Sequence, residues 1–246
     1  MAACIGIIGA MQVEVDLLLA HLEQARATTV SGSVFYEGTI ESVPVVIVRC
    51  GVGKVNAAMI CQTTIDRFGA TRIINTGIAG GLDRRLKVGD LVISSDAVQH
   101  DMDVTGLGYT PGTVPELEEH GKLSFAADEH LRAVVRQAVA EVAPELTVIE
   151  GRVASGDQFV SDTETWRRVV AQFGAACCEM EGAAIAQVAW RNDVPFVIVR
   201  TISDNADETS TTEYRDAEAE TARACAAITL RAIELLEAEG STGNPV

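Results

Sequence analysis

The sequence predicts an α/β fold of three layers, in which helices cover both faces of a central, twisted, mixed sheet. Two observations lead to this prediction. Of the 246 residues, 48% are hydrophobic but only 4% are aromatic, so Ala, Val, Ile and Leu must build the core, as suits a buried sheet covered by helices. Short β-branched apolar runs also alternate with helix-like stretches along the chain. No low-complexity linker interrupts the alternation, so we expect one domain at residues 1–240 and a flexible C-terminal tail at 241–246.

The first part of the chain supplies strands and helices in turn. Ile5–Ile8 is an apolar strand, and Val13–Gln24 carries apolar residues spaced along one helical face. Val43–Val48 is a second β-branched run. The Ala-rich stretch Lys54–Phe68 follows a Gly-x-Gly turn and predicts a helix, after which Arg72–Asn75 predicts the next strand.

The middle of the chain continues the pattern after a strand at Asp90–Ser94. Ala126–Val142 and Thr163–Phe173 are amphipathic and predict helices, with a strand between them from Leu146 to Ala154. The stretch Asp101–His120 is rich in Gly, Pro and Thr and predicts no element. Irregular segments of this length in compact domains are usually functional or lie at an interface.

The last part of the chain predicts a helix, a strand and a long closing helix. Gly182–Arg191 is small and apolar, so we expect this helix to pack against the sheet. Pro195–Ile202 is a β-branched run, and Ala217–Glu239 is an Ala/Glu/Leu helix that closes the domain.

The charge of the chain excludes several classes of partner. The net charge is −16 and no basic run is present, which argues against nucleic acid and against anionic membranes, because both need Lys/Arg clusters. The apolar N-terminal run is too short to span a membrane, and no basic residues precede it. We therefore expect a cytoplasmic protein. The six cysteines and four histidines are scattered, so we expect neither disulfides nor a metal site.

Two acidic clusters, Cys178–Gly182 and Arg200–Asp204, flank the predicted helix and strand near the end of the chain. If the strands beside that helix are parallel, Glu181 and Asp204 leave the sheet at the same edge. Ligands bind at the carboxyl ends of strands in such folds. Two carboxylates at that edge are a candidate acid–base pair.

Three further strand ends carry suggestive residues. Glu14 follows the first strand, in the first turn of the next helix, and Ser155–Phe159 follows a later strand. Gly77–Gly81 is predicted to be a glycine turn. It matches no dinucleotide or triphosphate loop, so its glycines suit close approach of the backbone to a small ligand. A tight turn without a ligand is the alternative.

Several blocks of the sequence, in the same order, resemble the bacterial 5′-methylthioadenosine/S-adenosylhomocysteine nucleosidases, within the nucleoside phosphorylase/nucleosidase superfamily. The resemblance covers almost the whole chain. The blocks are Ile5–Met11 with Glu14, Gly51–Val55, Asn75–Gly81, Leu86–Asp90, His100–Thr105, Ser155–Phe159, Glu179–Ala183 and Arg200–Asp204.

The resemblance implies hydrolysis of the bond between adenine and a 5′-thio-substituted ribose, without a cofactor. Breaking this bond builds positive charge on the sugar and negative charge on the departing base. The resemblance implies that Asp204, protonated because it is buried, is the acid for purine N7. It also implies that Glu14 activates the water and that Glu181 holds the ribose. Arg200 and Ser203 would orient these groups.

The resemblance also implies a pocket. Phe159 would stack on adenine, the backbone of Val160 would read the edge of the base, and Met180 would pack under the ribose. The other implied binding residues are Met11, Val52, Ile78, Ala79, Gly80 and Glu179. Many relatives have Ser where this chain has Ile78, so one hydroxyl is missing here. The partner subunit of a homodimer would complete the 5′ end of the pocket through the 101–120 loop, with Val104, Leu107 and Pro115.

Three alternatives stay open at this point. A purine nucleoside phosphorylase would need cationic or N–H donors for phosphate, and the loop Gly9–Glu14 offers no Arg or Lys. A hydrolase of 6-amino-6-deoxyfutalosine or another adenine nucleoside would share the acid and base and differ in the 5′ pocket. A non-catalytic nucleoside-binding protein would not need Glu14, Glu181 and Asp204.

Overall fold

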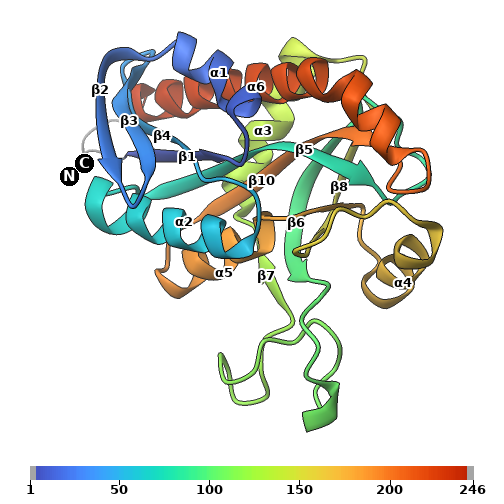
Figure 1. Cartoon of the computed structure of the whole chain (residues 1–246). Coiled ribbons are helices and arrows are strands. Elements are labelled where there is room, and N and C mark those ends of the chain that lie inside the picture. Colours follow the sequence, from blue (N-terminus) through green and yellow to red (C-terminus); the bar gives the residue numbers. More distant parts are fainter. Residues whose placement is uncertain (1–3, 243–246) are drawn as a thin grey trace.

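The computed structural model describes residues 4–242 and has the predicted three layers (Figure 1). The strands are β1 (Ile5–Gly9), β2 (Glu23–Val30), β3 (Ser33–Ile40), β4 (Val43–Arg49), β5 (Arg72–Gly81), β6 (Leu91–Gln99), β7 (Ser124–Ala126), β8 (Val148–Ser155), β9 (Cys177–Glu179) and β10 (Phe196–Asp204). The helices are α1 (Gln12–Ala20), α2 (Lys54–Phe68), a 3₁₀ turn η1 (Thr105–Leu107), α3 (Glu129–Val142), α4 (Thr163–Phe173), α5 (Gly182–Arg191) and α6 (Ser210–Thr242).

Alternating side chains of the strands build a core on each face of the sheet. Ile5 and Ile7 pack in one apolar cluster with residues of α1, α3 and α6, whereas Ile8 packs in another with residues of α2 and α5. In Figure 1, α1, α3 and α6 accordingly lie above the sheet, and α2 and α5 lie below it. The core is rich in Ile, Val and Ala, which confirms the α/β prediction from composition.

The sheet is mixed and part of it closes on itself. Its order is β10-β6-β8-β9-β5-β1-β4-β3-β2, and an additional pairing of β10 with β5 joins the first strand to the fifth. Strands β4, β1, β5 and β10 run parallel to one another. Strands β6, β8 and β9 run the opposite way. The ring of β10, β6, β8, β9 and β5 therefore brings residues of both strand directions together.

The predicted glycine turn at Gly77–Gly81 is wrong, because these residues continue β5. They pair on one side with β10 and, at Gly80 and Gly81, on the other side with β9. A Cβ at Gly77 would lie 2.4 Å from the Glu14 Oε1 atom, and one at Gly80 would lie 3.0 Å from Asp204 Oδ1. These glycines thus make room for neighbouring carboxylates within a strand.

Some polar or short elements of the structure were not predicted from the sequence. The predicted helix Val13–Gln24 ends at Ala20, and residues 23–40 form the β2–β3 hairpin. Strand β2 is largely exposed at the edge of the sheet, so it lacks the apolar run by which strands were recognised. Its two-residue turn, Ser31-Gly32, has positive φ at both positions, as a type I′ hairpin turn requires.

Helix α6 differs at both ends from its prediction. It begins at Ser210, seven residues earlier than Ala217, and runs to Thr242. Of the predicted tail at 241–246, Ser241 and Thr242 are thus the last helical residues, and residues 243–246 lie outside the described part of the chain. No helix within residues 4–242 combines the length and the apolar composition that crossing a membrane requires.

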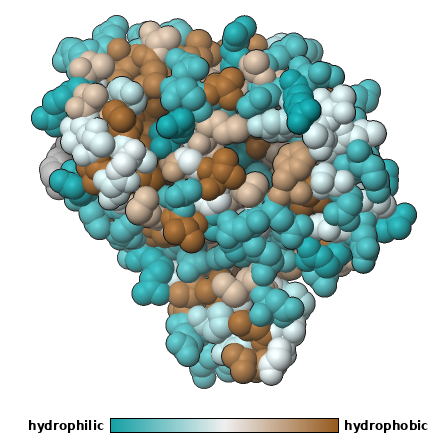
Figure 2. All heavy atoms as spheres, in the orientation of Figure 1, coloured by the Kyte–Doolittle hydropathy of each residue, from teal (hydrophilic) through white to brown (hydrophobic). Residues whose placement is uncertain are grey.

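The stretch 101–120 is irregular, as predicted, apart from η1 and a bridge between Val114 and Lys122. With the flanking residues up to β7 it forms an arm that projects from the body of the molecule at the bottom of Figure 1. Figure 2 shows hydrophobic residues on the surface of this arm, and Leu107 is 77% exposed. Apolar side chains on a projecting arm favour contact with another protein surface.

Candidate active site

One cavity of about 440 Å³ gathers most of the predicted site residues. Its wall includes the following predicted residues: Met11, Glu14, Val52, Ile78, Ala79, Gly80, Phe159, Glu179, Met180, Glu181, Ser203 and Asp204. They come from the β1–α1 junction, the β4–α2 turn, the end of β5, the loop after β8, the β9–α5 junction and the end of β10. This volume lies in the range of small-molecule sites, about 300–1,000 Å³.

Glu181 and Asp204 meet in this cavity, although the parallel arrangement suggested for their strands is wrong. Strand β9 is antiparallel to β5 and β10 is parallel to β5, so β9 and β10 run in opposite directions. Both have Gly80 as a register partner: it faces Cys178 of β9 and Asp204 of β10. The two acidic clusters therefore approach the same point of β5 from opposite sides.

Glu14 is held by three backbone N–H groups. Its Oε2 accepts hydrogen bonds from Ala10 N at 2.7 Å and Met11 N at 2.9 Å, and Oε1 accepts one from Ile78 N at 3.0 Å. Burial raises the pKa of Glu14, while the charge of Arg200 and these three donors oppose the rise. The N–H donors fix the orientation of the carboxylate toward the cavity and favour its ionised form.

Glu181 has fewer donors than Glu14. Its Oε1 accepts a hydrogen bond from Gly53 N at 2.7 Å, in the turn before α2. Burial, and next the charge of Glu179, raise the pKa of Glu181 well above its ordinary value. Glu181 is thus anchored through one oxygen, and its other oxygen is available to a ligand hydroxyl.

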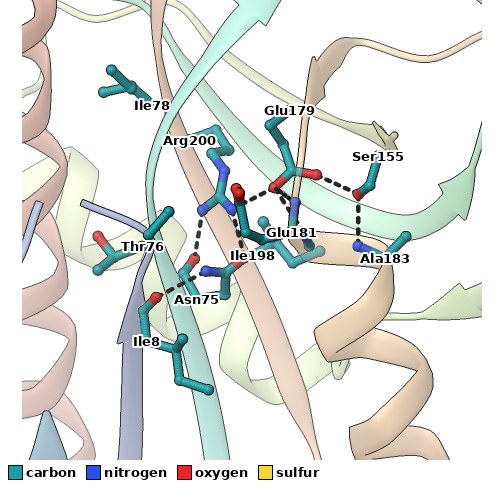
Figure 3. Close-up of polar contacts among 12 residues, drawn as sticks. Ile8, Asn75, Thr76, Ile78, Ser155, Glu179, Glu181, Ala183, Ile198 and Arg200 are labelled. Carbon is teal, nitrogen blue, oxygen red and sulfur yellow. Dashed lines mark hydrogen bonds and ion pairs between the residues drawn. The ribbon is translucent and has the colours of Figure 1, made fainter. Parts of the chain in front are cut away.

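Arg200 and Glu179 form a buried ion pair behind the cavity (Figure 3). The Nη2 atom of Arg200 lies 2.6 Å from Glu179 Oε2 and 2.5 Å from Asn75 Oδ1. Glu179 also accepts hydrogen bonds from Ser155 Oγ and from Gly182 N at the start of α5. Burial opposes the charge on Arg200, but Glu179, Glu14 and Glu181 together raise its pKa.

The contacts of this ion pair indicate that Arg200 and Glu179 support the other carboxyl groups of the site. Arg200 is absent from the described residues that line the cavity. The carboxylate of Glu179 lines the wall, yet both its oxygens are occupied by protein donors. Arg200 therefore acts through the electrostatic compensation of three buried carboxylates.

Asp204 ends β10 with its carboxyl buried. Oδ2 accepts a hydrogen bond from Ser203 Oγ at 2.8 Å, and Oδ1 accepts one from Ala206 N at 2.9 Å. Burial is the largest effect on this group and raises its pKa. Unlike Glu14, Asp204 has no cation among the groups that shift its pKa, so no nearby positive charge offsets the effect of burial.

Aromatic residues form the outer part of the cavity. Phe159 is 46% exposed and meets Tyr214 edge to face, with ring centroids 5.7 Å apart. The Tyr214 hydroxyl lies 3.1 Å from Met11 Sδ. The predicted residue Val160 lies outside the main cavity and lines a small recess beside Phe159 and Asp204.

The three predicted residues of the arm do not reach this cavity. Val104, Leu107 and Pro115 lie outside its described lining, on the arm that projects from the body (Figure 1). A single chain thus leaves this predicted part of the pocket unfilled.

Five residues that line the cavity were not predicted from the sequence: Ala10, Cys178, Thr211, Tyr214 and Arg215. Thr211, Tyr214 and Arg215 belong to the first turns of α6, which was predicted to begin at Ala217. The sequence Ser210-Thr211-Thr212-Glu213 matches the S/T-x-x-E pattern of a helix start. That signal would have placed these residues on a helix beside Asp204.

The site contains carboxylates but no candidate metal centre. Among residues 4–242, no three His, Cys, Asp or Glu side chains lie together as a group that could hold a metal ion. Its chemistry, as built from this chain, is that of carboxyl groups in unequal surroundings facing one cavity. Such an arrangement suits a reaction with one acid and one base.

Comparisons with known proteins agree with this architecture. A family model described as the phosphorylase superfamily matches residues 4–234. A 5′-methylthioadenosine/S-adenosylhomocysteine nucleosidase of Treponema pallidum is 44% identical over 230 residues, covering 85% of this chain and 84% of the relative.

Solved structures match the fold closely. The nucleosidase of the same description from Colwellia psychrerythraea, in complex with adenine, superposes with a TM-score of 0.91 at 35% identity, covering 96% of each chain. A futalosine hydrolase of Helicobacter pylori superposes with a TM-score of 0.89 at 30% identity, covering 96% of this chain and 99% of that one. The chain therefore belongs to the phosphorylase superfamily and, within it, to the 5′-methylthioadenosine/S-adenosylhomocysteine nucleosidases.

Proposed function

We propose that this protein is an N-glycosyl hydrolase that cleaves 5′-methylthioadenosine and S-adenosylhomocysteine, releasing adenine and the 5′-thio-substituted ribose. One observation carries the proposal: Glu14, Glu181 and Asp204 face one cavity, and each is held by a different set of donors. Unequal surroundings allow unequal protonation, which acid–base cleavage requires.

Asp204 is proposed to be the general acid. Burial raises its pKa, which favours the protonated form that an acid needs, and Phe159 and Gly80 line the same small recess as this carboxyl. Adenine stacked on Phe159, with its edge toward the backbone of Val160, would present N7 to this carboxyl. Ser203 orients Asp204 through its hydroxyl, and protonation of N7 makes adenine a better leaving group.

Glu14 is proposed to be the general base. Three N–H donors occupy it and the charge of Arg200 favours its ionised form. Its Oε1 accepts only one of the three hydrogen bonds, so a lone pair remains for a water molecule. The side chain of Ile78 lines the cavity there and supplies no hydroxyl.

Glu181 is proposed to hold the ribose hydroxyls and, in its ionised form, to stabilise positive charge on the sugar. Within the described residues, its one hydrogen bond as a carboxylate is to Gly53 N. Met180 would pack under the ribose, with Met11 and Val52 toward the 5′ substituent and Ala79 and Gly80 along the base. All of these residues line the cavity.

Hydrolysis is favoured over phosphorolysis by the charges around the cavity. Its buried lining residues include Glu14, Glu179, Glu181 and Asp204 and no cation. Arg200, the buried cation behind them, is engaged by Glu179 and Asn75. A phosphate nucleophile in the buried part of the cavity would therefore meet like charge without a free cation there to offset it.

We further propose a homodimer in which the partner's arm completes the 5′ end of the pocket. Two surfaces support it. Leu107 projects on the arm, and Val52, Val55 and Met59 leave an apolar strip exposed along the start of α2, next to the cavity that Val52 lines. Exposed apolar strips of this kind mark interaction sites.

The decisive experiment measures adenine release from a panel of 5′-substituted adenosines, with and without phosphate. We expect turnover of methylthioadenosine and adenosylhomocysteine that phosphate does not accelerate. Formation of a ribose 1-phosphate product would overturn the hydrolytic proposal. Because a futalosine hydrolase has a similar fold, the panel includes 6-amino-6-deoxyfutalosine, and preferential turnover of that substrate would establish this second candidate.

A further inference from the structure

Arg215 is a cation at the rim of a cavity whose interior is acidic. It lines the cavity together with Thr211 and Tyr214, residues that share one face of the first turns of α6 because they are three and four positions apart. Its side chain is exposed, whereas Glu14, Glu181 and Asp204 are buried. Arg215 thus stands at the mouth, where a ligand still touches solvent.

The helix gives Arg215 no carboxylate partner. The position four residues on is Ala219, and Glu218, three residues on, bonds to the Tyr214 hydroxyl at 3.0 Å. Glu213 is engaged by Asn205. No hydrogen bond or ion pair of Arg215 occurs in the described part of the chain, although that part forms ion pairs on α6 itself. A protein of net charge −16 thus keeps a free guanidinium at its pocket.

The position of Arg215 corresponds to the 5′ side of the proposed substrate. The ring of Tyr214, the adjacent residue, meets Phe159, but its hydroxyl lies 3.1 Å from Met11 Sδ, at the proposed sugar and 5′ end. The opposite end, with Asp204, Gly80 and Val160, is the proposed adenine end. A 5′ substituent that leaves the cavity along Tyr214 therefore passes Arg215.

We propose that Arg215 is a specificity-determining residue that favours adenosines whose 5′ substituent ends in a carboxylate over those with an uncharged 5′ substituent. This inference rests on the nucleosidase function proposed above. A guanidinium forms paired hydrogen bonds with a carboxylate. A substrate carboxylate placed deeper in the cavity would face the buried carboxylates of the protein, so the substrate carboxylate is accepted only at the mouth of the cavity.

The carboxylate can come from an amino-acid group, as in S-adenosylhomocysteine, or from a simple carboxyalkylthio group. The test therefore uses four substrates: S-adenosylhomocysteine, its methyl ester, a 5′-carboxypropylthio-adenosine without an amino group, and methylthioadenosine. Adenine release is measured with the full-length protein, the variants Arg215→Ala and Arg215→Glu, and the control Arg223→Ala. Arg223 is an exposed arginine on the same helix outside the described cavity lining.

Arg215→Ala is expected to raise KM for both carboxylate substrates about three- to five-fold, the effect of an exposed ion pair. KM for the ester and for methylthioadenosine should change by less than two-fold. The kcat values should stay unchanged, because the contact with the carboxylate is equally strong in the ground state and the transition state. Arg215→Glu should increase the loss, added salt should reduce the difference, and Arg223→Ala should leave all four substrates unchanged.

The outcomes separate this inference from the function on which it rests. If the unaltered protein releases adenine but Arg215→Ala changes charged and uncharged substrates equally, or changes neither, the inference is wrong and the nucleosidase function stands. A loss confined to S-adenosylhomocysteine would show that the amino-acid group as a whole is read, and would refute recognition of the carboxylate alone. If the unaltered protein releases adenine from none of the four, both proposals fail.

Discussion

At the scale of single residues, similar carboxyl groups of the site have different surroundings. Glu14 receives three backbone N–H bonds and the field of Arg200, whereas Asp204 is buried without a cation among the groups that act on it. Glu179, the carboxylate most tightly bound to Arg200, has no free oxygen for a ligand. Resemblance suggested most of these residues, but only their contacts separate supporting groups from candidates for catalysis.

The first prediction concerns Asp204→Asn. An amide of the same shape can still accept from Ala206 N, which Asp204 does at 2.9 Å, but it has no proton to give to N7. We expect kcat for adenine release to fall by about 10²–10⁴-fold, as for loss of a general acid, with an unchanged circular dichroism spectrum.

Asp216→Asn is the matched control for this variant. Asp216 is exposed on α6 and outside the described cavity lining, so its amide should retain full turnover. If Asp204→Asn kept nearly full activity on methylthioadenosine, Asp204 would not be the acid.

At the scale of elements, β5 illustrates how a strand can shape a site. Gly77 has Glu14 against it, and an added Cβ would lie 2.4 Å from Oε1. We therefore predict that Gly77→Ala displaces the Glu14 carboxylate, lowers kcat at least ten-fold and destabilises the fold by about 1–3 kcal/mol, the usual cost of overpacking. Kinetics and urea unfolding measure the two effects.

A double-mutant cycle identifies the cause of the Gly77 effect. In a Glu14→Ala background the clashing oxygen is gone, so Gly77→Ala should cost far less stability than in the unaltered protein. An equal cost in both backgrounds would mean that strain in β5, rather than the carboxylate, makes Gly77 necessary.

The elements also show what the sequence could predict. Buried β-branched strands and amphipathic helices were predicted because burial imposes a period on their residues. The β2–β3 hairpin was missed because its outer strand is polar and exposed. The extension of β5 was missed because its glycines are required by close contacts with Glu14 and Asp204, which are distant in sequence. The sequence left open whether β9 and β10 are parallel. They are antiparallel, because each strand's direction is set by its partners in the closed ring.

At the scale of the whole molecule, burying carboxyl groups links stability to pH. Burial raises the pKa of Glu14, Glu181 and Asp204, so the folded state holds more protons than the unfolded state above about pH 4.3, the ordinary pKa of a glutamate. The free energy of unfolding should therefore fall as pH rises from there through the raised pKa values. Exposed carboxylates with a lowered pKa, such as Asp103, act in the opposite sense and below that window.

Glu181→Gln tests this linkage. Its amide oxygen can still accept from Gly53 N, but it carries no charge at any pH. We expect a smaller fall of the unfolding free energy between pH 5 and about pH 8, measured by urea unfolding at constant protein concentration, because any association would also affect stability. Glu220→Gln, on the exposed side of α6, should keep the slope of the unaltered protein. A Glu181→Gln slope equal to that of the unaltered protein would contradict the linkage.

The arm at residues 101–120 gives the last prediction, since its apolar residue Leu107 is 77% exposed and lies outside the cavity of its own chain. If a partner's arm completes each site, then Leu107→Asp damages the partner's site and leaves its own chain's carboxyl groups intact. Asp204→Asn does the reverse. Each variant alone should be nearly inactive, but mixed dimers formed by co-expression contain one site with an intact Asp204 and an intact arm. Adenine release by the mixture should then clearly exceed the sum of the two variants, with dimer formation followed by sedimentation. Activity no greater than that sum, in a preparation where mixed dimers are present, would show that each chain completes its own pocket.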